Sequence, residues 1–176
     1  MKNIFLTYAK YNKDADQTAV SLLNALSHEE REKERGSYYK SLSGLSRHLL
    51  QGTIYLQGLC KSGLSHNPQA MKAFAPLEGI SIPQDALTEA QWKALVPVFE
   101  IVDNSVILLV SALNDADFTV SIKIPWYQGN PDAVPLSFLL QSLMVHGTHH
   151  RGQISQILDE LKIDHNYSSI KADFIG

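Results

Sequence analysis

Residues 135–162 read PLSFLLQSLMVHGTHHRGQISQILDELK, and apolar side chains recur in this stretch at steps of three and four. This period places them on one face of an α-helix. Two histidines and a glutamine share that face, whose members are Leu136, Leu139, Leu140, Leu143, His146, His150, Gln153, Ile157 and Leu161. Pro135 suits the first helical turn, where its missing N–H would have no partner. We therefore predict a long core helix over residues 135–162 with imidazoles on its buried face.

Three other segments, residues 4–27, 41–61 and 88–113, show the same helical period. His48 lies on the apolar stripe of the second segment. The third opens with TEAQ, in which the Thr and Gln have the spacing of a capping box. It also contains Pro97, which predicts either a kink or two abutting helices. Four amphipathic helices with little strand content predict an all-α fold, a four-helix bundle.

The connections between these helices differ in length and character. Residues 28–39, HEEREKERGSYY, predict a solvated loop or short helical turn. Residues 64–87 contain three prolines and no sustained period, which predicts a long irregular connection between the second and third helices. Residues 118–126 alternate in polarity and predict a short extended segment before the last helix, followed by a turn at YQGNPD. In the tail after residue 162, Phe174 and Ile175 could dock on the bundle.

Composition favours a single globular domain over residues 1–176, with 44% hydrophobic and 19% charged residues. The net charge of -3 and the lack of a basic run exclude a nucleic-acid partner. Cys60 is the only cysteine, which indicates a reducing compartment, and we expect it to be a small core residue. Apolar runs such as residues 106–113 are too short to span a membrane, and no secretory signal follows Met1. We expect a cytoplasmic protein without a membrane partner.

The spacing of His146 and His150 has a chemical consequence. The two residues are separated by roughly 40° around the helix axis and one turn along it, so both imidazoles can meet one ion. An isolated pair of this kind more often lies on a wet face or donates to a backbone carbonyl. Its place on an apolar stripe, together with His48 on another buried stripe, favours a metal site. His149 belongs to a more polar stripe and is expected at the edge of the site.

Other polar and small residues near these positions leave alternatives open. Gly147 and Gly152 each weaken a helix, so either another group approaches closely there or they are tolerated substitutions. Glu100 and Asp103 could orient an imidazole, although solvated surface positions are favoured for carboxylates. Three more histidines lie in loops or at helix ends and are expected to be solvated: His28, His66 and His165.

Three segments resemble the DinB/YfiT-like metalloprotein family: HGTHHRGQI at 146–154, SLSGLSRHLL at 41–50 and YNKDAD at 11–16. The resemblance is weakest over residues 64–126. It implies that His48, His146 and His150 are the metal ligands. It also implies an up-down-down-up bundle with a long second connection, a homodimer and a stress-response role. Relatives in the wider superfamily include thiol-dependent S-transferases and isomerases, and the family name implies no DNA binding.

Three neutral nitrogen ligands leave at least one coordination position open, as in catalytic zinc sites. Imidazole suits a divalent zinc or nickel ion, and also iron or copper. We therefore expect an enzyme, a hydrolase or a thiol-dependent transferase, in which the metal activates water or a low-molecular-weight thiol for attack on a small-molecule substrate. Substrate is expected near residues 64–87. The alternative is a non-catalytic metal-binding stress protein or dimeric scaffold, and no general base is assigned.

Overall fold

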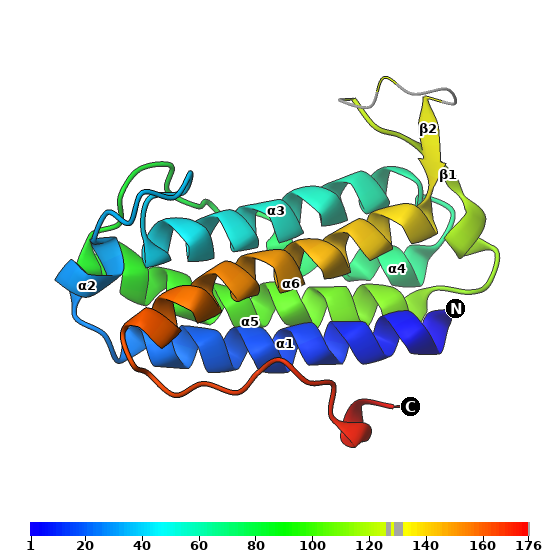
Figure 1. The fold of residues 1–176 in the computed structure, drawn as a ribbon. Helices are drawn as coiled ribbons and strands as arrows, with labels where there is room; N and C mark the ends of the chain where they lie inside the picture. Colours follow the sequence, from blue (N-terminus) through cyan, green and yellow to red (C-terminus); the bar gives the residue numbers. More distant parts are fainter. Residues whose placement is uncertain (126–127, 129–131, 176) are drawn as a thin grey trace.

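The computed structural model describes residues 1–125, 128 and 132–175. Four long helices lie side by side along most of its length (Figure 1): α1 (Lys2–Asn24), α3 (Leu42–Ser62), α5 (Glu89–Ala112) and α6 (Leu136–Glu160). The pairs α3–α6, α1–α5, α1–α6 and α3–α5 are all in contact, so each helix has two long neighbours. The all-α prediction is confirmed, and the predicted helix bounds agree to within three residues at each end.

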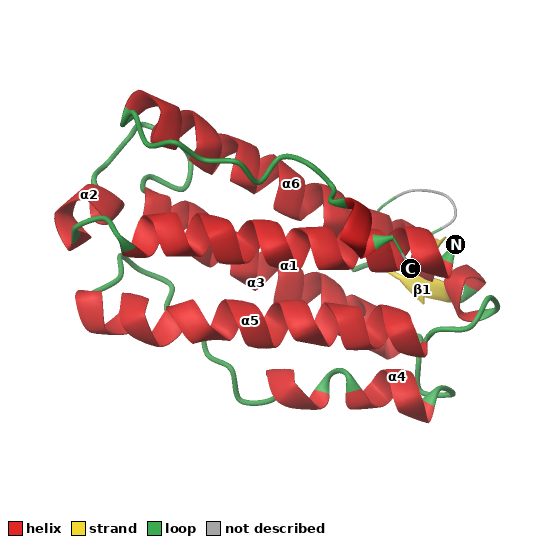
Figure 2. Ribbon diagram, turned by 90° about the horizontal axis from the view of Figure 1, so that it is seen from below, coloured by secondary structure: helices red, strands yellow, loops and turns green. Residues whose placement is uncertain are grey.

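The connections hold more regular structure than the sequence pattern predicted. The segment between α3 and α5 contains α4 (Pro68–Lys72) and the short 3-10 helix η1 (Ala75–Leu77), so an irregular connection was wrong. Asn67 caps α4 by accepting a hydrogen bond from the Ala70 N–H at 3.0 Å. Figure 2 shows α4 lying beside α5, and the two helices are in contact. The connection therefore covers one side of the bundle.

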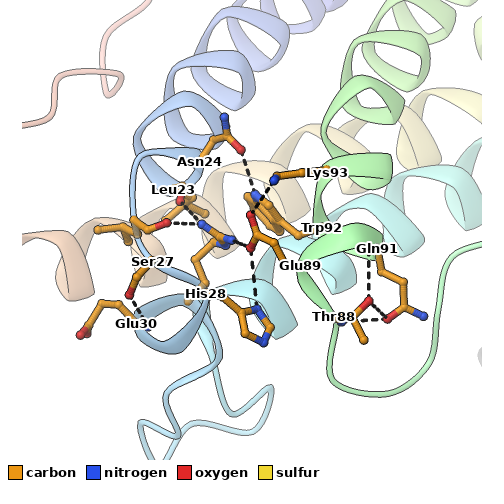
Figure 3. A network of polar contacts seen from close by, with 12 residues as sticks. Leu23, Asn24, Ser27, His28, Glu30, Thr88, Glu89, Gln91, Trp92 and Lys93 are labelled. Atoms are coloured by element: carbon orange, nitrogen blue, oxygen red, sulfur yellow. Dashed lines mark hydrogen bonds and ion pairs between the residues drawn. The ribbon is translucent and has the colours of Figure 1, made fainter.

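The segment between α1 and α3 forms a short helix, α2 (His28–Glu32), which agrees with the predicted short helical turn, and this helix carries a buried cation. The Arg31 guanidinium is 1% exposed, donates to backbone carbonyls at the end of α1, and pairs with the carboxylate of Glu89. Beside it, the Trp92 indole donates to the Asn24 side chain at 3.1 Å (Figure 3). A buried guanidinium requires such partners. α2 thus joins the end of α1 to the start of α5.

α5 begins with the predicted capping box and is one continuous helix. Thr88 and Gln91 form the capping box, with both hydrogen bonds present. The helix runs without interruption through Pro97, so the alternative of two abutting helices was wrong. By length and composition α5 is long and apolar enough to cross a membrane. It was not identified as such from the sequence, because its uninterrupted apolar runs are short. In this fold part of its apolar surface is buried in the core, including Val102 and Leu109, while Leu108 is 53% exposed.

A small hairpin precedes α6. β1 (Ser121–Lys123) pairs with antiparallel β2 (Ala133–Pro135), with Ile122 opposite Val134. This confirms the predicted extended segment for residues 121–123, whereas residues 118 and 119 belong to a 3-10 helix. Pro135 ends β2 and stands just before the first turn of α6. Trp126 and most of the predicted YQGNPD turn lie outside the described residues.

Two further 3-10 helices complete the chain, η2 (Asp117–Thr119) before the hairpin and η3 (Ala172–Phe174) in the tail. The tail docks on α1, where the Phe174 carbonyl accepts a hydrogen bond from the Thr7 hydroxyl at 3.3 Å. Phe174 packs against the core as predicted, but Ile175 is 71% exposed. The prediction that both side chains dock was therefore right only for Phe174.

The core consists of two apolar clusters with a polar layer between them. Asp16 of α1, Asp103 of α5 and Arg151 of α6 are all buried in this layer. Arg151 donates to Asp16 at 2.8 Å and to Asn12 at 2.6 Å. Since Arg151 directly follows His150, the polar layer adjoins the histidines of α6.

Candidate metal centre

The structure brings together the three histidines that the sequence singled out. His48 comes from α3, and His146 and His150 come from successive turns of α6, the helix that packs against α3. One ring nitrogen from each residue can be chosen so that all three lie within 4.8 Å of one another. The Nε2 atoms of His48 and His146 are 3.3 Å apart. Two nitrogen ligands on one tetrahedral zinc ion are separated by about 3.3 Å, so this spacing suits a shared metal ion.

A hydrogen bond to Gln153 orients the His150 imidazole. His150 is buried, and its Nδ1 lies 2.7 Å from the Gln153 amide oxygen. With Nδ1–H donating to that oxygen, Nε2 is left unprotonated and free to bind an ion. Gln153 lies on the helical face where the sequence placed it, and it contacts His150. The Nδ1 of His146 is buried and has no hydrogen-bond partner among the described residues.

Electrostatics keep these imidazoles neutral. Burial, and then the neighbouring imidazoles, lower the pKa of His48 and of His146 to about 4. Burial also lowers the pKa of His150, against the hydrogen bond to Gln153, which raises it. A metal ion binds only the unprotonated ring. At neutral pH the three rings therefore offer nitrogen lone pairs without first losing a proton.

Room for one of the rings comes from a glycine on the opposite helix. A Cβ placed on Gly52 of α3 would lie 2.3 Å from Cε1 and 2.5 Å from Nε2 of His146. Gly147 instead makes room for the Arg151 guanidinium, 2.9 Å from its would-be Cβ. Gly152 has nothing within 4 Å, which favours the alternative of a tolerated substitution over a close approach at this position.

Tyr39 is the residue of this site that the sequence analysis missed. It lies in the loop before α3, with its hydroxyl 2.8 Å from Nε2 of His48. Its ring stacks on the His48 ring with centroids 3.9 Å apart, and meets His150 edge-on at 5.3 Å. Burial raises the pKa of Tyr39, which favours the protonated phenol. This phenol donates to Nε2 of His48 in the tautomer that leaves Nε2 unprotonated. The only signal in the sequence was a pair of aromatic residues directly before the Lys-Ser that opens the helix of His48.

The remaining candidates lie away from the centre. His149 is exposed at the edge, as predicted, with its ring centroid 4.8 Å from that of His150. Glu100 is a surface carboxylate near Lys13, as favoured. Asp103 is buried, but in the polar layer with Asp16, so neither alternative for it was right. Cys60 is a buried core residue, as expected.

Of the other three histidines, His28 and His66 are exposed as predicted, whereas His165 is partly buried. The side chain of His66 is exposed but pairs with the buried Asp117 at 2.7 Å. The side chain of His165 is mostly covered and lies 3.2 Å from Asp159. His28 is exposed beside Glu89. None of these three belongs to the cluster formed by residues 48, 146 and 150.

Two hollows lie beside the centre. One of about 430 Å³ is bounded by Tyr39 and by residues 84–87, the end of the connection between α3 and α5, and its charged lining includes Lys40, Arg47 and Asp85. A larger hollow of about 830 Å³ lies between α1 and α6 and is mostly apolar. It reaches His149 but contains none of the three clustered histidines. The smaller hollow is not lined by these histidines either, so it meets the site through Tyr39 as the larger one does through His149.

No protein-family model, curated protein or solved structure matches this chain. The chemistry of the centre therefore rests on its own geometry.

Proposed function

We propose that this chain is a metal-dependent enzyme of the DinB/YfiT-like superfamily, in which His48, His146 and His150 hold a divalent ion, zinc or nickel in the first place. The observation that carries the proposal is the convergence of three neutral imidazoles from two facing helices, with two Nε2 atoms 3.3 Å apart. Family membership is supported by the sequence motifs at residues 41–50 and 146–154. The up-down-down-up arrangement of a four-helix bundle belongs to the same proposal, supported by the long connection between α3 and α5.

The side chains around the centre have distinct roles in this proposal. An ion bound by three neutral nitrogens lowers the pKa of bound water towards about 7, or deprotonates a thiol. Gln153 holds the His150 ring in the orientation that directs Nε2 to the ion. The charged side chains of the hollow next to Tyr39, among them Arg47 and Asp85, suit a small polar substrate or a low-molecular-weight thiol. The reaction would be a hydrolysis or a thiol transfer in a cytoplasmic setting.

The test compares two adjacent histidines. Protein purified without chelator or histidine tag is expected to carry about one zinc or nickel ion per chain by elemental analysis. His150→Ala should weaken metal binding by about 100-fold or more, since a ligand costs at least as much as the groups that orient it. His149→Ala, the exposed neighbour, should bind as tightly as the wild type. Equal metal affinity of the wild type and both variants would contradict the proposed site.

A second candidate function is a non-catalytic, metal-binding stress protein. It is favoured by the coverage of the centre, because His150 is 4% exposed and Tyr39 lies over His48. Screening the metal-loaded protein against hydrolase and thiol-transfer substrates separates the two functions. Turnover that disappears in His150→Ala supports the enzyme. Metal-dependent thermal stability with no turnover supports the scaffold.

We also propose a homodimer formed through the larger hollow between α1 and α6. Large apolar side chains exposed around it include Ile4, Phe138 and Val145, and exposed patches of this kind often mark interfaces. Light scattering should give twice the chain mass of 19.6 kDa. Val145→Glu should give the monomer mass, while Leu108→Glu, an exposed apolar position on α5, should not. A monomeric wild type would contradict the proposal.

A further inference from the structure

The hydroxyl of Tyr39 lies beside one of the three converging imidazoles. It lies 2.8 Å from Nε2 of His48, and that same nitrogen lies 3.3 Å from Nε2 of His146. The phenol oxygen is therefore as close to one of the converging nitrogens as neighbouring donor atoms around one metal ion are to each other. The ring contacts with His48 and His150 place it over two of the three imidazoles.

The loop that carries Tyr39 packs closely against the start of α3. A Cβ on Gly44 would lie 1.9 Å from the Tyr39 carbonyl oxygen, so the loop rests directly on α3. Ser41 caps α3 by accepting a hydrogen bond from the Gly44 N–H at 3.1 Å. Lys40 adopts a φ of 68°, which is uncommon for a residue with a side chain. These contacts fix the end of the loop that carries Tyr39.

Coordination chemistry makes the present hydrogen bond incompatible with a bound ion. The unprotonated Nε2 of His48 has one in-plane lone pair, which either accepts the phenol hydrogen or binds a metal. When an ion takes that lone pair, the phenol oxygen loses its partner while remaining beside the ion, and binding as a phenolate would release the phenol proton to solvent. Tyrosine oxygen is an established ligand for iron in haem proteins. Three neutral nitrogens leave a position that an anionic oxygen can fill.

We propose that Tyr39 supplies an oxygen ligand to a metal ion held by His48, His146 and His150. This inference rests on the metal site proposed above. A zinc centre with these four ligands can still expand to five, so a substrate adds beside the phenol oxygen or displaces it. The hollow of about 430 Å³ bounded by Tyr39 is where such a substrate would approach.

Copper is the probe for this proposal because it binds nitrogen and oxygen sites tightly and reports a phenolate ligand by colour. One equivalent of Cu²⁺ is added to the wild type, Tyr39→Phe and Tyr38→Phe, and visible absorption is recorded. The wild type and Tyr38→Phe should show a phenolate-to-copper charge-transfer band, which Tyr39→Phe should lack. Tyr38 is a matched control because it adjoins Tyr39 but is 90% exposed. Phenylalanine keeps the ring stacking, so thermal unfolding of the metal-free proteins should differ little.

Zinc affinity gives a second readout, and Tyr39→Phe should lower it by about 10-fold or more. The wild type could bind copper without a charge-transfer band, and His150→Ala could abolish that binding. This result would contradict the tyrosine ligand but support the three-histidine site. A band that survives in Tyr39→Phe would overturn the tyrosine ligand too. If the wild type binds neither copper nor zinc, both proposals fail.

Discussion

Replacing Gly52 with alanine is expected to remove metal binding while leaving the fold intact. The new methyl group would lie 2.3 Å from the His146 ring, far inside contact distance. That ring ends a side chain with two rotatable bonds, so it can swing away more easily than either helix can shift. Metal affinity should fall by about 100-fold or more, the loss expected when a ligand leaves its position. The free energy of unfolding of the metal-free protein should change by about 1 kcal/mol or less.

Gly58→Ala on the same helix is the matched control. Nothing lies within 4 Å of the Cβ that this change adds, so alanine should stabilise α3 by up to about 1 kcal/mol without moving a ligand. Isothermal titration with zinc and thermal unfolding of both metal-free variants give the comparison. Zinc binding by Gly52→Ala within a few-fold of the wild type would show that the His146 ring does not contribute to the site.

The long helices were predictable because each buries one continuous apolar face over many turns, which leaves a strong period in the sequence. The five-residue helices α2 and α4 are too short to show such a period and depend on contacts that form only after folding. Arg31 illustrates this limit. Its segment is highly charged, yet the guanidinium is buried because Glu89, 58 positions later in the chain, comes to meet it.

The candidate site was predictable only in part, for a similar reason. Positions on a helical face can be computed from residue number, which brought His48, His146 and His150 into consideration. Face geometry does not identify a partner on another element. It could not predict that Gly52 on the facing helix makes room for the His146 ring. It could not predict Tyr39 either, because this residue lies in a loop without a helical period.

The polar layer beneath the site could not be inferred from the chain either. Asp103 has the helical position of a core residue but the chemistry of a surface residue, and its burial depends on Asp16 and Arg151 from two other helices. Burial, together with the charge of Asp16, raises the pKa of Asp103 well above its ordinary value. Asp103 therefore holds a proton more readily than a free carboxyl does, and the Arg151 guanidinium stabilises the charged form of Asp16. This makes Arg151 the residue on which the layer depends.

Arg151→Met is accordingly expected to lower the free energy of unfolding by about 3–5 kcal/mol, the cost of leaving one member of a buried ion pair alone. The guanidinium is buried, and it bonds Asp16 and Asn12 while lying over the Tyr11 ring at 5.1 Å. Lys171→Met, which breaks the exposed pair with Asp14, should cost about 1 kcal/mol or less. Urea unfolding of the metal-free proteins measures both changes. A loss below about 1 kcal/mol for Arg151→Met would contradict the assigned role of the cation.

The pH dependence of that loss gives an independent check. Burial raises the pKa of Asp16, which Arg151 opposes, so removing the cation should raise this pKa further. A carboxyl whose pKa is higher in the folded state than in the unfolded state stabilises the fold at low pH and loses that contribution as pH rises. The difference between wild type and Arg151→Met should therefore shrink from pH 7 towards pH 4. The histidine contributions are common to both proteins and cancel in this difference. Adding Asp16→Asn to Arg151→Met should recover part of the stability at pH 7, because the double variant no longer buries an unpaired charge.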